Sequence, residues 1–319
     1  MKYIPCRRLL RGGRRLLRIL FSRAPYREKL YELYRLCGIR YVPVTMRGNR
    51  IWLDLSDRTL ARHFFIHRDY EPFEVFLLER AARKGMTALD IGACIGFHTL
   101  IISRCVGESG RVIAFEPAPG NYSVLMRNIR ANGFVNVSPL NAAVMDYRGS
   151  IDLYLSKTNF GDHRVYDAGD EVRFEEGVPR DRVKVPAVRV DDVLEELRLT
   201  ADVIKIDVQG AEMAAFRGMR HALSHPEVIL FCEFWPYGLR KFGASPKEML
   251  DFLASLRLEV CEICEEDGCI KPIDKDELIR RFPDLGFTNL MCFHQGSSSE
   301  KALSAFLSDR GIQRSSANR

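Results

Sequence analysis

The stretch that decides the fold is residues 87–98, Thr-Ala-Leu-Asp-Ile-Gly-Ala-Cys-Ile-Gly-Phe-His. A short apolar run ends at Asp90, and Gly92 and Gly96 follow in the pattern Asp-x-Gly-x-x-x-Gly. Glycine adopts backbone angles that other residues avoid, and the first N–H groups of a helix have no partner within the helix. We therefore predict a strand-to-helix turn against which a nucleoside ligand can lie.

Strands and helices are predicted to alternate on both sides of this turn. The predicted strands are 87–91, 111–116, 135–140, 203–207, 228–234, 258–263 and 289–293, and helical patterns separate them at 97–105, 121–132, 191–197, 211–223 and 246–256. Such alternation is typical of an α/β fold, a parallel sheet with helices on both faces. An insertion at 149–190 interrupts it with two alternating stretches around a polar loop, and a loop of this length is usually functional.

The chain has 319 residues, enough for one catalytic domain and an extension. We expect a largely helical extension at 1–50, a catalytic domain at 51–296 with its core at 86–294, and a flexible tail at 297–319. No apolar run approaches the ~20 residues of a membrane-spanning helix. Charged residues interrupt the apolar runs at the N-terminus, which argues against a cleaved signal peptide.

Positive charge is concentrated at the N-terminus. Residues 1–50 contain 14 Lys and Arg against Glu28 and Glu32, a net charge of +12 in a chain whose total is +6. Such a segment can rest on anionic lipid headgroups, or it can be a solvated helix packed on the domain. We predict a cytoplasmic protein with peripheral membrane contact through residues 1–24, and we expect no nucleic-acid partner. The oligomeric state is left undefined.

The nine cysteines suit buried thiols in a reducing compartment rather than a disulfide scaffold. Cys261, Cys264 and Cys269 are closely spaced, and the nearest further candidates are Cys292 and His294. Zinc takes four ligands, or three and a water. No metal site is predicted.

Polar residues at the ends of the predicted strands indicate the cofactor. Glu116 ends the second strand, where an acid can accept hydrogen bonds from ribose hydroxyls, and Asn141 and Ala142 follow the third strand, where adenine can bind. The carboxylate of Asp90 would repel a pyrophosphate, and the Gly-x-Gly-x-x-Gly pattern of dinucleotide sites is incomplete. S-adenosylmethionine, which carries an amino group and a sulfonium, fits better than a dinucleotide.

A second landmark is the apolar strand around Lys205, which ends at Asp207. A lysine inside such a strand is costly unless it is paired, and Asp207 or Glu233 on the next strand is the expected partner. The insertion places His163 where it could cover the cofactor as part of a lid.

Residues from about 70 to 294 resemble the FkbM family of S-adenosylmethionine-dependent methyltransferases. The resemblance rests on these segments: Tyr70-Glu71, Leu89 to Gly96, Phe115-Glu116-Pro117, Asn141 to Val144, Val190 to Leu194, Lys205 to Glu212, and the strand 228–233. Cys94 stands where the family usually has Asn, and Gln209 where it usually has Glu. The resemblance implies a class I methyltransferase fold, a seven-stranded Rossmann-like sheet whose last strand, 289–293, runs antiparallel.

The resemblance also implies O-methylation of a hydroxyl on a sugar, a glycan or another small natural product. A non-catalytic S-adenosylmethionine-binding scaffold is the alternative, and a nicotinamide-dependent oxidoreductase is a third. The predicted cofactor-binding residues are Glu71, Asp90, Gly92, Ala93, Cys94, Gly96, Glu116, Asn141, Ala142 and Asp207. The predicted catalytic residues are Asp207, Lys205, Glu233 and His163.

Overall fold

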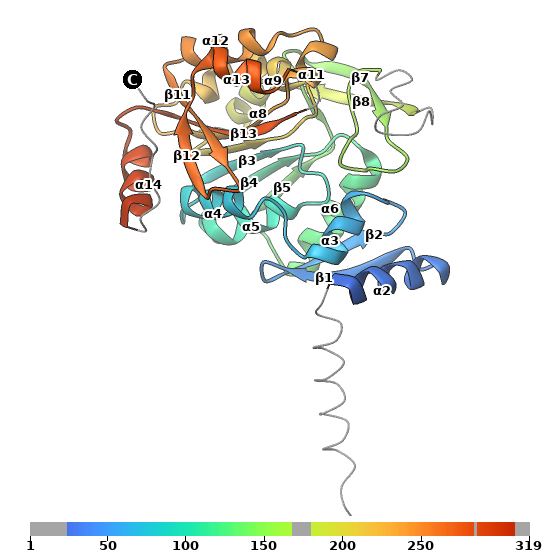
Figure 1. Ribbon diagram of the computed structural model, residues 1–319. Coiled ribbons are helices and arrows are strands. Elements are labelled where there is room, and N and C mark those ends of the chain that lie inside the picture. Colours follow the sequence, from blue (N-terminus) through green and yellow to red (C-terminus); the bar gives the residue numbers. More distant parts are fainter. Residues whose placement is uncertain (1–23, 168–179, 284–285, 310–319) are drawn as a thin grey trace, which may run out of the picture.

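A computed structural model describes residues 24–167, 180–283 and 286–309. Its central sheet has eight strands in the order β12-β11-β13-β10-β9-β3-β4-β5 (Figure 1). Their bounds, in that order, are Cys269–Pro272, Leu258–Cys264, Thr288–His294, Ile229–Phe234, Val203–Ile206, Thr87–Ile91, Arg111–Phe115 and Val137–Leu140.

Strand direction identifies the fold. The five strands from β10 to β5 run parallel to one another, and β13 pairs antiparallel with both β10 and β11. This is the predicted class I methyltransferase architecture, with 289–293 inside the antiparallel strand. The predicted number of strands was one too few, because the chain turns back after Cys264 and adds β12 at the edge.

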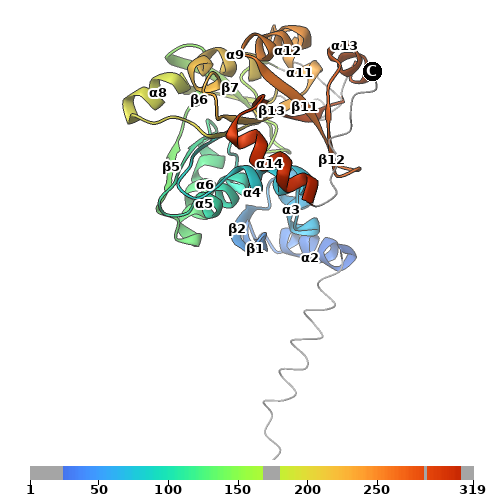
Figure 2. The same ribbon diagram turned by 90° about the vertical axis from the view of Figure 1, so that its left-hand side faces the viewer.

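Side chains that alternate along each strand pack against two layers of helices. Leu89, Ile91 and Ile204 face a cluster that includes residues of α8, α9, α12 and α13, whereas Ala88 and Val203 face α4, α5 and α14. The two layers lie on opposite sides of the sheet in both views (Figures 1 and 2). The helices are α4 (Pro72–Ala81), α5 (Phe97–Val106), α6 (Pro119–Asn132), α8 (Val190–Leu197), α9 (Glu212–Gly218), α10 (Arg220–Leu223), α11 (Pro236–Lys241), α12 (Pro246–Ser255) and α13 (Lys275–Arg281).

The predicted boundary at residue 50 falls inside a β-hairpin. Helix α2 (Ala24–Leu36) is followed by an antiparallel hairpin of β1 (Tyr41–Met46) and β2 (Asn49–Asp54), and then by α3 (Leu60–His67), so residue 50 lies within a strand. The hairpin is fixed to the core because Asn128 on α6 accepts a hydrogen bond from the Trp52 N–H at 2.7 Å. Residues 1–23 lie outside the described part, so membrane contact through 1–24 stays a prediction.

A helix, α14 (Ser298–Asp309), forms directly after the predicted boundary, where a flexible tail was expected. Leu303 and Leu307 are buried against the sheet and α4. The helix start is held by Glu227, whose carboxylate accepts from the N–H groups of Ser298 and Ser299 at 3.2 and 2.9 Å. Residues 310–319 lie outside the described part.

Two strands of the insertion, β7 (Gly149–Leu155) and β8 (Asp181–Val188), form a small sheet with β6 (Ala143–Val144), which precedes the insertion, in the order β6-β8-β7. The segment 156–164 follows β7 and leads toward the carboxyl ends of the central strands, and residues 168–179 are outside the description. Among the described residues, none of the helices is both long and apolar enough to cross a membrane.

Candidate active site

The turn after β3 is built on two glycines that cannot be replaced without strain. Gly92 has φ 82°, and a Cβ there would lie 1.8 Å from the carbonyl oxygen of Asp207. Gly96 has φ 92°, and its Cβ would lie 2.6 Å from Leu125 Cδ1. Only glycine allows the loops after β3 and β9 to approach this closely, so the turn exposes backbone rather than side chains.

Asp90 ends up buried beneath this turn. Thr99 Oγ1 donates a 2.5 Å hydrogen bond to its carboxylate, which fixes the side chain toward α5. Burial raises the pKa of Asp90 to about 6. A cationic ligand group beside it would favour the ionised form and would itself be favoured.

Glu116 follows β4 and takes two backbone hydrogen bonds, from the N–H groups of Cys94 and Ala118, each at 2.8 Å. Burial raises the pKa of Glu116 to about 7. The backbone N–H of Cys94, a predicted cofactor residue, therefore orients the carboxylate of Glu116. Glu116 therefore stands next to the glycine turn, where an acid that contacts a ribose is expected.

Two adjoining cavities open over the carboxyl ends of the strands. The larger, about 350 Å³, is lined by the turn residues Asp90, Gly92, Ala93 and Cys94 and by the candidate catalytic residues Lys205, Asp207 and Glu233. The smaller, about 50 Å³, is lined by Glu116, Ala142, Phe160 and His163. Gly92, Cys94 and Asp207 line both cavities, so the two are parts of one site.

Three predicted cofactor residues do not line either cavity. Asn141 Nδ2 donates to the carbonyl oxygens of Glu116 and Pro117, at 2.7 and 3.0 Å, so its amide supports the loop that carries Glu116. Gly96 starts α5, and Glu71 caps α4 with φ 44°. Burial, then the charge of Glu74, raises the pKa of Glu71 to about 8.

The partner expected for Lys205 is corrected. Lys205 Nζ lies 2.6 Å from Glu74 Oε1 on α4 rather than beside Asp207 or Glu233. Residues 203 and 205 point to the same face of β9, and that face is covered by α4. Burial alone would lower the pKa of Lys205, but the carboxylates of Glu74, Glu71 and Asp207 outweigh it and raise that pKa well above its ordinary value.

Asp207 and Glu233 face the larger cavity from neighbouring strand ends. Gln209 Nε2 donates to Asp207 Oδ1 at 2.7 Å, so the residue that replaces the usual glutamate still contacts the site. Burial, followed by the charges of Asp207 and Glu212, raises the pKa of Glu233 well above its ordinary value. Its Oε2 is buried and has no hydrogen-bond partner among the described residues.

His163 lies on the smaller cavity, away from Glu233. Its Nδ1 lies 3.0 Å from the N–H of Ser156 and accepts a hydrogen bond from it, which places the ring proton on Nε2. Burial lowers the pKa of His163 to about 4. The imidazole is therefore neutral near pH 7, with one nitrogen already occupied.

Several lining residues escaped the sequence analysis. They are His63, His98, Arg164 and Trp235, together with Glu74, which pairs with Lys205. Arg164 is buried, pairs with Asp162 at 2.7 Å and stacks 4.9 Å from the ring of Trp235. A signal existed only for Glu74, which lies three residues after Glu71 and hence on the same face of a helix.

Comparisons with known proteins identify the family of the chain. The model of the methyltransferase FkbM domain matches residues 90–260, more than half of the chain. Methyltransferase sdnD of Sordaria araneosa is 28% identical over 178 residues, which cover 48% of this chain and 68% of that protein. Hexuronic acid methyltransferase AglP of Haloferax volcanii is 26% identical over 185 residues, which cover 57% of this chain and 67% of that protein.

One solved structure is a methyltransferase FkbM from Methylobacillus flagellatus, similar with a TM-score of 0.41 and 16% identity. The match covers 67% of this chain and 44% of that one, so this chain spans less than half of its length.

Proposed function

The chain belongs to the FkbM family of methyltransferases, and on that premise we propose that it methylates a hydroxyl group of a sugar-like acceptor. Its methyl donor is S-adenosylmethionine, as in this family. The observation that carries the proposal is the pair of carboxylates, Asp207 and Glu233, that line the larger cavity beside the donor turn. A hydroxyl needs a base as it attacks, and a carboxylate can supply one.

The chain's own residues fit the donor. Gly92 lines both cavities without a side chain, and Glu116 can accept hydrogen bonds from two ribose hydroxyls. Ala142 lines the smaller cavity, and we expect it to contact the adenine. Asp90 lines the larger one, and we expect it to pair with the methionyl amino group. His163 belongs to the donor side in this arrangement, where its Nε2–H can donate a hydrogen bond.

Glu233 is the proposed proton acceptor. When bound, S-adenosylmethionine would supply a methyl group on a sulfonium, whose sulfur would leave with the bonding electron pair. The acceptor oxygen would form the new bond to the methyl carbon, and its proton would pass to the ionised carboxylate of Glu233, whose Oε2 has no hydrogen-bond partner among the described residues. Asp207 orients the acceptor hydroxyl or the methionyl amine, and Lys205 supplies a fixed positive charge behind both carboxylates.

The sugar class is supported by the mixed lining of the larger cavity. Tyr70, Phe97 and Trp235 offer ring faces, and acids and histidines stand between them, a composition that suits the apolar faces and hydroxyl edges of a sugar ring. The relative AglP is named a hexuronic acid methyltransferase.

Labelled S-adenosylmethionine and a panel of hexuronic acid and neutral glycosides test the proposal. Transfer to a hydroxyl gives an alkali-stable methyl ether, whereas transfer to a carboxylate gives an alkali-labile ester. We expect the ether, a fall in kcat of roughly 10²–10⁴-fold for Glu233→Gln, and unchanged donor affinity. Glu108→Gln, on an exposed residue, is the matched control. An ester product, or full kcat in Glu233→Gln, contradicts the proposal.

A further inference from the structure

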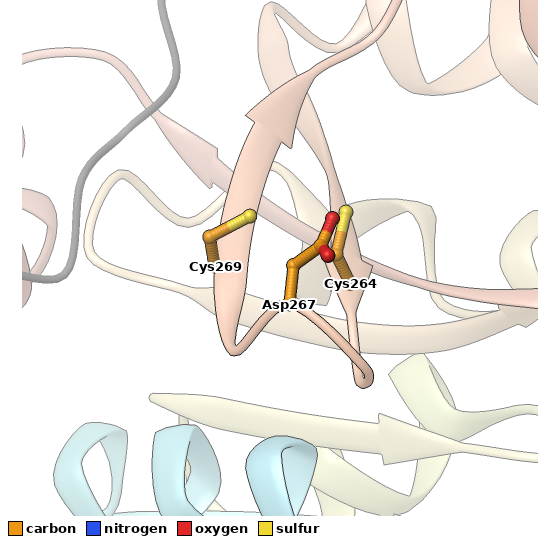
Figure 3. A group of neighbouring side chains, drawn as sticks. All are labelled: Cys264, Asp267 and Cys269. Carbon is orange, nitrogen blue, oxygen red and sulfur yellow. The ribbon is translucent and has the colours of Figure 1, made fainter.

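The hairpin at the sheet edge brings two thiols and a carboxylate together, outside both cavities. Cys264 ends β11, Cys269 begins β12, and the two are register partners. Asp267 lies in the turn between them. The Sγ atoms and a carboxylate oxygen all lie within 4.8 Å of one another, and Figure 3 shows the three side chains around one point of the hairpin.

These three side chains can be reached from solvent, and their chemistry suits one class of metal ion. Both cysteines are free thiols and half-buried, and Asp267 is exposed, so an ion can enter from solvent. Thiolates favour zinc-like, soft or borderline ions over magnesium or calcium. Zinc binds Cys and Asp in tetrahedral sites, and three protein ligands leave a fourth position for water.

We propose that Cys264, Asp267 and Cys269 bind a thiophilic divalent metal ion of the zinc class. The prediction of no metal considered Cys261 as the third ligand. Cys261 instead packs in the apolar cluster with Ile263 and Met291, and the turn supplies Asp267. The site does not depend on the proposed O-methylation.

The neighbouring charges are compatible with an ion. Lys271 Nζ lies 2.9 Å from Asp267 Oδ2, and a carboxylate can bind a metal through one oxygen while its other oxygen keeps a hydrogen bond. Binding of an ion to the two thiols would release their protons.

The ion would fix a turn that is connected to the active site. Glu265, next to Cys264, accepts hydrogen bonds from the N–H groups of Phe73 and Glu74 at 3.0 and 2.7 Å. These are first-turn N–H groups of α4, which have no partner within the helix. The same helix places the Glu74 carboxylate against Lys205, so the ion would also hold the start of α4.

Titration of the reduced full chain with Co²⁺, and displacement by Zn²⁺, tests the site. We expect about one equivalent bound, with a thiolate-to-cobalt charge-transfer band. The band distinguishes this site from Glu71, Glu74 and His98, whose ligand atoms also cluster but include no sulfur. Zinc should raise the Tm of the wild type, because an ion that binds only the folded state stabilises it.

Cys264→Ser and Cys269→Ser should each weaken binding by roughly 10–100-fold or more and abolish the zinc-dependent rise in Tm. Asp267→Asn removes a ligand without touching the strands, so it serves if a cysteine variant misfolds. Cys37→Ser, on an exposed thiol, is the matched control. No binding by the reduced wild type, or equal affinity in all four variants, overturns the proposal.

Discussion

Lys205 Nζ on β9 and Glu74 Oε1 on α4 are 2.6 Å apart, and both side chains are buried. The pair joins the centre of the sheet to the helix whose N-terminus holds Glu71. It also fixes a positive charge near Asp207 and Glu233, which line the larger cavity. A buried pair of this kind sets the geometry of a site more than it adds stability.

Glu74→Gln should destabilise the protein by about 3–5 kcal/mol, because it leaves the Lys205 ammonium buried without its closest partner. The free energy of unfolding in urea measures this loss. The double variant Glu74→Leu with Lys205→Met should recover most of it, because both charges are then absent. Asp251→Asn, which breaks an exposed pair with Lys247, is the control and should have little effect. Equal stability of Glu74→Gln and the wild type would contradict the buried pair.

Gly92→Ala should destabilise the protein far more than Gly133→Ala. Both glycines have positive φ, 82° and 70°, so backbone strain should make each alanine variant less stable by roughly 1–3 kcal/mol. At Gly133 nothing lies within 4 Å of the added Cβ, whereas at Gly92 it meets the Asp207 carbonyl oxygen. Urea unfolding of the two variants compares them directly, and donor binding should survive only in Gly133→Ala. Similar losses in both would show that the two loops are not in close contact.

Stability should fall as the pH rises from about 4.5 to 7, in part because of Glu116. Its pKa is about 7 in the folded protein against an ordinary value of 4.5, so the folded state holds more protons in this window. Stability decreases with pH where the folded state binds more protons than the unfolded one. Between pH 4.5 and 7, the ionisation of Glu116 should lower the free energy of unfolding by on the order of 3 kcal/mol.

Glu116→Gln removes the ionisable group at this position, so the free energy of unfolding of the variant should depend less steeply on pH than that of the wild type. The comparison isolates Glu116 from Asp57, Asp90 and Glu212, whose pKa values burial also raises. Donor affinity of the wild type should improve as pH rises through about 7, when the carboxylate that accepts ribose hydroxyls forms. Parallel stability curves for the two proteins would rule out a raised pKa at Glu116.

The sequence predicted those parts of the site that are local in the chain. The turn at Gly92 and Gly96 and the acid at Glu116 follow directly from strand ends, because parallel strands bring their carboxyl ends to one edge. The partner of Lys205 was not predictable in this way. Glu74 lies on a helix far away in the sequence, and only the packing of α4 on β9 brings the two together.

Tertiary packing also explains why the sequence analysis did not predict the full extent of α14 or the arrangement of the cysteines on β11 and β12. Helix α14 is stable because Leu303 and Leu307 reach the sheet, a contact that local composition cannot reveal. The register of β11 and β12 places Cys264 opposite Cys269 and turns Cys261 to the other face. Cysteine spacing alone gave no information on register, so it could not indicate which of these cysteines lie on the same face of the hairpin.

Asp90→Asn should abolish or strongly weaken S-adenosylmethionine binding while the protein remains folded. The carboxylate is buried and lines the larger cavity beside Gly92, so a cationic donor group there gains a charged partner that an amide cannot replace. Thr99→Val removes only the hydroxyl that orients Asp90 and should cause a smaller loss. Calorimetric titration with the donor ranks the three proteins, and circular dichroism confirms folding. Equal affinity in the wild type and Asp90→Asn would place the methionyl amine elsewhere, with Asp207 as the next carboxylate on the same cavity.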